Sequence, residues 1–267
     1  MDINMIDKQI KMRPYWHVDM KWITALLFIP VFSVTLFLAN LYYITNKINA
    51  VNVASKLLQA MYAPGGNNTV QEVKEIRKMI QKSPDRSLKP FPGLDIKITE
   101  QDLDKYPVDE IKGRVFLEFA KNMYDFDSGE TGTFSKFGLM AIFTLEGHQS
   151  IGKILLYGVL ISLVFLVLLV YFSYGFGRLI SVGVTCILVS FPSMLFLTIL
   201  QKIPKNSLES SGAGEISMQQ RIYSFVSTVG PTISQMLLIN YITVTILGAV
   251  LLFVGIVGQM RYKNMLK

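Results

Sequence analysis

Long runs without charged side chains alternate with polar segments along this chain of 267 residues. Four of these runs contain the apolar stretches 23–45, 153–175, 179–201 and 236–259. A helix needs about 20 apolar residues to cross the hydrocarbon layer of a membrane, and each stretch is long enough. The pattern therefore predicts an all-α integral membrane protein with four transmembrane helices.

The ends of two runs need separate interpretation. Pro231 and the polar "STVG" before it predict a break in the last run, so we expect 202–235 to form a second outer loop with an amphipathic segment.

The first span could be taken for a cleaved signal peptide. Its apolar core exceeds the roughly 7–15 residues of such a region, and no small-residue cleavage site follows. We therefore expect it to be retained.

Composition supports the membrane prediction. Hydrophobic residues make up 51% of the chain and charged residues only 17%, against about 25% charged in a typical soluble domain. The alternative is a soluble bundle of buried helices. Four charge-free runs would leave such a bundle too little polar surface to cover them.

The distribution of basic residues predicts the orientation. Lys and Arg outnumber Asp and Glu in 1–22 and in 260–267, whereas the segment 46–152 is nearly neutral. Because positive loops stay on the cytoplasmic side, we expect a cytoplasmic arm, a cytoplasmic tail and an extracytoplasmic domain at 46–152. The protein is then a multi-pass protein of the plasma membrane that contacts lipid. The net charge of +7 is a topology signal and indicates no nucleic acid partner.

The extracytoplasmic domain is predicted to be mainly helical. Helical spacing predicts a helix at 70–82, and the first span is expected to continue as a helix until "PGGNN". Thr99 and Asp102 form a capping pattern, and Pro107 is placed near the start of a further helix. Apolar residues then recur at four-residue intervals on one face: Ile111, Val115, Phe119 and Met123.

Two further predictions concern packing in this domain. The four-residue stripe should pack on the helix at 70–82, with the outer ends of the transmembrane helices as a floor. "LKPFPGLDIKI" is predicted to be an extended connector that includes a short strand. The apolar stretch 137–145 is too short to span the membrane and could lie at its surface as a re-entrant or interfacial element.

Few side chains offer reactive chemistry. Cys186 is the only cysteine and lies within the third span, and the two histidines, His17 and His148, lie on opposite sides of the membrane, so no metal site and no cofactor are predicted. The acidic "DFDSGE" lacks the pattern of a calcium loop and is interpreted as a solvated turn. Apart from Lys153 at the edge of the second span and the thiol of Cys186, the spans contain no ionisable residue other than tyrosine, which makes a channel or transporter the third hypothesis.

The candidate catalytic residues are His148 and Glu146, which lie just before the second span. A histidine there could act as general acid or base near neutral pH, and Glu146, Asp127 or Glu130 could orient it. The alternative is an interfacial residue whose ring lies among lipid headgroups. No nucleophile or oxyanion donor is evident nearby.

The order of elements resembles that of the lipoprotein intramolecular transacylase family of Gram-positive bacteria. "TLEGHQSIGK" is similar to the segment that carries a histidine before the second span in that family, and "ITEQDLDKY" to an acidic helix of its outer domain. The family's arginine and aspartate near this histidine are missing, as is its aromatic, histidine-containing pattern from "KIPKNSLESSGAGEISMQQ". The resemblance implies a catalytic role for His148 alone.

Two hypotheses follow from these observations. The first is a non-enzymatic four-span membrane protein that binds a protein partner through its extracytoplasmic domain, as an accessory, scaffold or assembly subunit. The second is a membrane-embedded acyl transferase that acts on lipid or lipoprotein, with His148 as base. A water-accessible groove joining His148 to a carboxylate would favour the second hypothesis.

Overall fold

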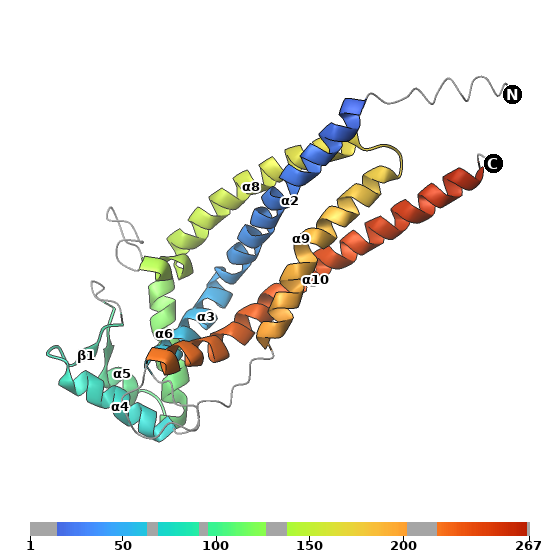
Figure 1. Cartoon of the computed structure of the whole chain (residues 1–267). Helices are drawn as coiled ribbons and strands as arrows, with labels where there is room; N and C mark the ends of the chain where they lie inside the picture. The colour runs from blue at the N-terminus through green and yellow to red at the C-terminus, as the bar shows by residue number, and fades with distance from the viewer. Residues whose placement is uncertain (1–14, 63–68, 91–95, 127–137, 202–217, 266–267) are drawn as a thin grey trace, which may run out of the picture. The chain divides into compact units, whose positions relative to one another are not determined.

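The computed structural model describes residues 15–62, 69–90, 96–126, 138–201 and 218–265 (Figure 1). The chain divides into two compact units. We call Met1–Ala39, Ile154–Leu195 and Ile239–Lys267 the span unit, and Asn40–Lys153 with Phe196–Leu238 the helical domain. The elements in chain order are α2 (Tyr15–Ile44), α3 (Lys47–Tyr62), α4 (Thr69–Lys82), β1 (Ser87–Leu88), β2 (Ile98–Thr99), α5 (Glu100–Asp104), α6 (Val108–Tyr124), the 3-10 helix η2 (Gly138–Phe143), α8 (Leu145–Phe172), α9 (Gly177–Gln201) and α10 (Met218–Met265).

Within the described residues, four helices are long and apolar enough to cross a membrane, the number that the sequence predicts. They cover Trp16–Ile44, Leu145–Phe172, Gly177–Ile199 and Val229–Met265, with mean hydropathies between 2.1 and 2.9. At most 33% of the residues in the most apolar window of each helix are buried inside the protein. The fold is therefore all-α, and its outward-facing apolar side chains are those that suit the hydrocarbon layer around a multi-pass membrane protein.

The last of these helices corrects one prediction. α10 runs without interruption from Met218 to Met265 with Pro231 inside it, so the prediction that Pro231 divides this run is wrong. A proline removes one backbone hydrogen bond from a helix. Val229 and Ile233, on either side of Pro231, pack on Ile44 and Val53 in the helical domain, and this burial favours a continuous helix.

The span unit is held by close backbone contacts and by hydroxyl groups. A Cβ atom at Gly183 of α9 would lie 2.7 Å from the carbonyl oxygen of Gly248 in α10, so only glycine fits there. The hydroxyls of Thr35 in α2 and Ser162 in α8 are 2.8 Å apart. Small residues and interhelical hydroxyl bonds are the usual contacts between helices in lipid.

The helical domain has a conventional apolar core. The predicted stripe on α6 is fully buried: Ile111, Val115, Phe119 and Met123 are exposed by 5% or less. α6 packs mainly on α3 and makes a smaller contact with α4. The helix predicted at 70–82, which is α4, therefore makes the smaller of the two contacts. α3 supplies small side chains, Ala50 and Ala54, that allow α6 to approach closely. The sequence shows α3 only as an extension of the first span.

The remaining elements complete this core. β1 and β2 pair antiparallel, with Ser87 opposite Thr99, and enclose the predicted connector. η2 lies within the predicted surface stretch 137–145, and its Ala141 is completely buried in the domain core, so this part of the stretch also packs on the domain. Leu58, Ile76 and Phe116, from α3, α4 and α6, are among the most deeply buried large side chains.

Candidate functional site

The start of α8 places His148. Thr144 caps this helix: its hydroxyl accepts a bond from the backbone N–H of Gly147 (3.2 Å), and its carbonyl accepts one from the N–H of His148 (2.9 Å). A Cβ at Gly147 would lie 2.1 Å from the carbonyl oxygen of Ala141, so glycine is required for this close approach. α8 therefore begins at Leu145, ahead of the predicted start at 153, and His148 lies in its first turn.

The imidazole of His148 has two partners, both at the end of α2. Its Nδ1 is 2.9 Å from the Thr45 hydroxyl oxygen, and its ring stacks on Tyr42 with centroids 4.2 Å apart and planes inclined by 20°. Thr45 is completely buried, whereas Tyr42 is partly exposed. The ring is therefore packed between two residues of the domain.

A break in the helix makes Thr45 available for this contact. α2 ends at Ile44 and α3 begins at Lys47, so the helix predicted to continue from the first span is interrupted. Asn46 caps α3, with its side-chain oxygen 3.3 Å from the N–H of Ile48 and its carbonyl 2.7 Å from the N–H of Ala50. The N–H of Asn46 donates to the carbonyl of Tyr43, three residues back, and not to that of Tyr42, its partner in a regular α-helix. The Tyr42 carbonyl instead accepts a bond from the Thr45 hydroxyl, at 3.1 Å.

The Thr45 hydroxyl oxygen lies 3.1 Å from the Tyr42 carbonyl oxygen and 2.9 Å from Nδ1 of His148. Its one proton can be donated to only one of these two atoms. If the proton goes to the Tyr42 carbonyl, the Thr45 oxygen accepts the Nδ1–H of His148. The other ring nitrogen, Nε2, is then the unprotonated one and the one able to accept a proton.

Of the carboxylates named as possible partners of His148, only Glu146 lies within the described residues. Glu146 precedes His148 by two residues on α8, so the two side chains leave the helix about 200° apart and do not face each other. Glu146 lies in the first turn, where a negative charge favours the helix N-terminus. Asp127 and Glu130 lie outside the described residues.

An ion pair lies at the start of α3. The ammonium of Lys47 is 2.8 Å from each carboxylate oxygen of Asp125, the first residue of "DFDSGE", and 5.9 Å from the centre of the Tyr124 ring. Burial raises the pKa of the Tyr124 hydroxyl. Cys186 is buried in α9, as predicted. Among the described residues, no group of three or more His, Cys, Asp or Glu side chains could hold a metal ion.

A second polar cluster was not identified from the sequence. A depression of about 180 Å³ lies between β2, α5 and α6. Buried side chains of Ile98, Val115 and Phe119 contribute apolar lining. Its polar lining consists of Lys97, Asp102, Lys105, Glu118 and Asn122. The sequence gives Thr99 and Asp102 as a cap but does not show which residues of α6 face them.

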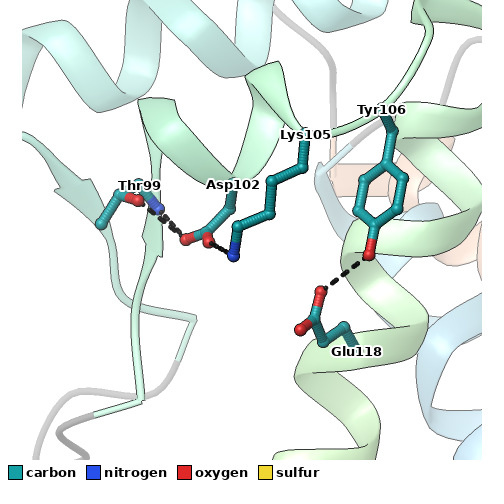
Figure 2. Close-up of polar contacts among 5 residues, drawn as sticks. All are labelled: Thr99, Asp102, Lys105, Tyr106 and Glu118. Carbon is teal, nitrogen blue, oxygen red and sulfur yellow. Dashed lines mark hydrogen bonds and ion pairs between the residues drawn. The ribbon is translucent and has the colours of Figure 1, made fainter.

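Asp102, Lys105 and Glu118 each form a polar contact with a neighbouring side chain (Figure 2). Asp102 Oδ2 accepts the backbone N–H (2.9 Å) and the hydroxyl (2.8 Å) of Thr99, which confirms the predicted capping box. Asp102 Oδ1 accepts the ammonium of Lys105 at 2.7 Å. On the opposite wall, the Tyr106 hydroxyl donates to Glu118 Oε2 at 3.2 Å. Burial alone would raise the pKa of Asp102, but the bonds from Lys105 and Thr99 lower it below its ordinary value.

Comparisons with protein-family models, with curated proteins and with solved structures give no match. The resemblance to the transacylase family therefore stays a prediction that rests on the layout of the spans and on the position of His148.

Proposed function

We propose that this chain is a non-enzymatic four-span membrane protein that binds a protein partner through its helical domain, as an accessory, scaffold or assembly subunit. In this proposal the domain is extracytoplasmic and both termini are cytoplasmic, as the distribution of basic residues favours. The protein presents a folded helical domain at the membrane surface.

The observation that carries this proposal is the packing of His148. Its ring is stacked on Tyr42, and its Nδ1 is bonded to the buried Thr45 hydroxyl. Both contacts connect the start of α8 to the end of α2, so they stabilise the junction from which α3 and the domain core begin. These two contacts explain His148 as a structural residue, without a role in catalysis.

The domain also carries apolar side chains on its surface. Those of Met61, Val70, Met79 and Val108 are exposed by 40% to 51%. Apolar contacts of this kind contribute most when they are buried at the centre of a protein interface. They are therefore the first candidates for contacts with a partner.

The experiment is purification of the tagged full-length chain from its native membranes in mild detergent, with quantification of co-purifying proteins. We expect one protein at a fixed ratio to this chain, and we expect its loss when Val70 or Met79 is replaced by Ser. Val159, exposed by 44% in α8, gives the matched control, since Val159→Ser should leave the ratio unchanged. A monomer without a partner would overturn the proposal.

A second candidate function is acyl transfer at the membrane, with His148 as general base. The observation in its favour is the bond between Thr45 and Nδ1, because it occupies one ring nitrogen and leaves Nε2 for proton transfer when Nδ1 carries the proton. In this scheme Thr45 positions the ring and does not touch the substrate. Glu146 has no assigned role in it, since it leaves α8 in another direction.

Variants of His148 and Thr45 distinguish the two candidates. If the contact is structural, His148→Ala and Thr45→Val both destabilise the domain by about 1–3 kcal/mol, and the acylation state of membrane lipoproteins stays unchanged. If His148 is a base, His148→Ala abolishes acylation in a protein that remains folded. Hydrogen exchange of α3 amides reports the stability, and mass spectrometry of lipoproteins reports the chemistry.

A further inference from the structure

The depression between β2, α5 and α6 has the features of a small-ligand site, independently of the function proposed above. Its size of about 180 Å³ is below the roughly 300–1,000 Å³ of sites for drug-sized ligands and cofactors. A nucleotide would not fit. The size suits a molecule the size of a small amino acid.

A fixed cation lines one wall. The Lys105 ammonium is held by Asp102 at 2.7 Å, and Asp102 is itself held by two bonds from Thr99. An ammonium has three N–H donors, and only one of them is used among the described residues. Lys97, also in the lining, forms no ion pair within the described part of the chain. This wall can therefore receive an anionic group.

A fixed anion lines the opposite wall. Glu118 Oε2 accepts the Tyr106 hydroxyl at 3.2 Å, which leaves Oε1 without a bond to any described residue. Glu118 and Lys105 line the same depression, yet they form no ion pair with each other. Each is held by a neighbour on its own side (Figure 2). The two opposite charges are thus kept apart and face the same space.

We propose that this depression binds a small zwitterion, a free α-amino acid, with its carboxylate on Lys105 and its ammonium on Glu118. Val115 and Phe119 line the depression but expose little of their side chains, which leaves apolar surface only for a short aliphatic side chain such as that of alanine. The four charged groups of the lining carry no net charge, which suits a ligand that is itself neutral overall.

The test is a titration of the full-length protein in lipid nanodiscs with alanine, N-acetylalanine, alaninamide and glucose, followed by ligand-detected NMR. N-acetylalanine lacks the ammonium and alaninamide lacks the carboxylate. Because each lost charged hydrogen bond changes affinity by about tenfold or more, we expect alanine to bind and both analogues to bind at least tenfold more weakly.

Variants locate the binding. Lys105→Gln and Glu118→Gln should each weaken alanine binding about tenfold. Lys121→Gln on α6 and Glu75→Gln on α4 are matched controls outside the depression and should bind as the wild type does. Lys105→Gln also disturbs the cap of α5, whereas Glu118→Gln does not. The analogue series on the unmodified protein provides a test that does not depend on any variant.

Several results would overturn the proposal. Equal affinity for N-acetylalanine and alanine would indicate a simple anion site, and equal affinity for alaninamide a cation site. Binding of glucose without binding of alanine would indicate a sugar site. Absence of any binding, or unchanged alanine affinity in Glu118→Gln, would remove the assignment altogether.

Discussion

Helices contact one another in different ways in the span unit and in the helical domain. In the domain, large apolar side chains such as Leu58 and Phe116 are buried against one another from different helices. In the span unit, large apolar side chains such as Leu163 and Val167 are more than half exposed, and helices meet through glycine and hydroxyl groups. The hydrophobic effect drives the first kind of packing, and close van der Waals contact drives the second.

The largest expected effect comes from one substitution made in both units. Leu58→Ala removes a completely buried side chain from the domain core and should cost about 2–5 kcal/mol. Leu163→Ala shortens a side chain that is 55% exposed in α8 and should cost much less, because an exposed side chain leaves no cavity in the protein when it is shortened. Hydrogen exchange of amides in α3 and in α8, on the full chain in nanodiscs, measures each effect. Equal losses in the two units would contradict the comparison.

The next effect tests the glycine contact of the span unit. Gly183→Leu should separate α9 from α10, since a Cβ there would already lie 2.7 Å from the Gly248 carbonyl oxygen and 2.8 Å from the Leu252 nitrogen. Overpacking of this kind costs about 1–3 kcal/mol. The control is Gly177→Leu, where no atom lies within 4 Å of the added Cβ. Thermal unfolding in detergent should show a loss for Gly183→Leu only.

The sequence predicts the spans well because they depend on composition over a long window. Charge-free runs identify four helices without any knowledge of their neighbours. The buried stripe on α6 is also evident from its four-residue spacing, and the capping box of Thr99 and Asp102 from residues close in the chain. Each of these features is local or periodic.

The features that the sequence does not predict depend on contacts between distant segments. Thr45 and His148 are far apart in the chain. Asn46 in "LYYITNK" is a residue type that often begins a helix, but it does not show that the break brings the Thr45 hydroxyl to an imidazole. Pro231 is a local signal for a break, but packing of its neighbours on α3 overrides it. Thr144 before an apolar run was a usable cap signal, and it would have placed His148 inside the helix.

A smaller expected effect is the loss of stability of the helical domain at acidic pH. The pKa of Asp102 is held below its ordinary value, so the contribution of this carboxylate to stability is complete above that value and is lost as pH falls toward the lowered one. Unfolding of the domain should therefore become easier in acid, below about pH 4. Asp102→Asn should reduce this dependence and lower stability at neutral pH. Hydrogen exchange of α5 and α6 amides measured against pH gives the test, and an unchanged acid dependence in the variant would contradict it.

The smallest expected effects are the stability changes of two Gly→Ala substitutions, one in each unit, which should have opposite signs. Gly113 lies in the interior of α6, is exposed, and has no atom within 4 Å of an added Cβ, so Gly113→Ala should stabilise the domain by about 0.5–1 kcal/mol. Gly248→Ala in α10 should destabilise the span unit, because its Cβ would lie 2.8 Å from Cys186 and 2.9 Å from the Gly183 carbonyl oxygen. Thermal unfolding of both variants measures the two signs. If both substitutions stabilised the protein, helix propensity would dominate in both units, and close backbone contact would not be what holds α9 against α10.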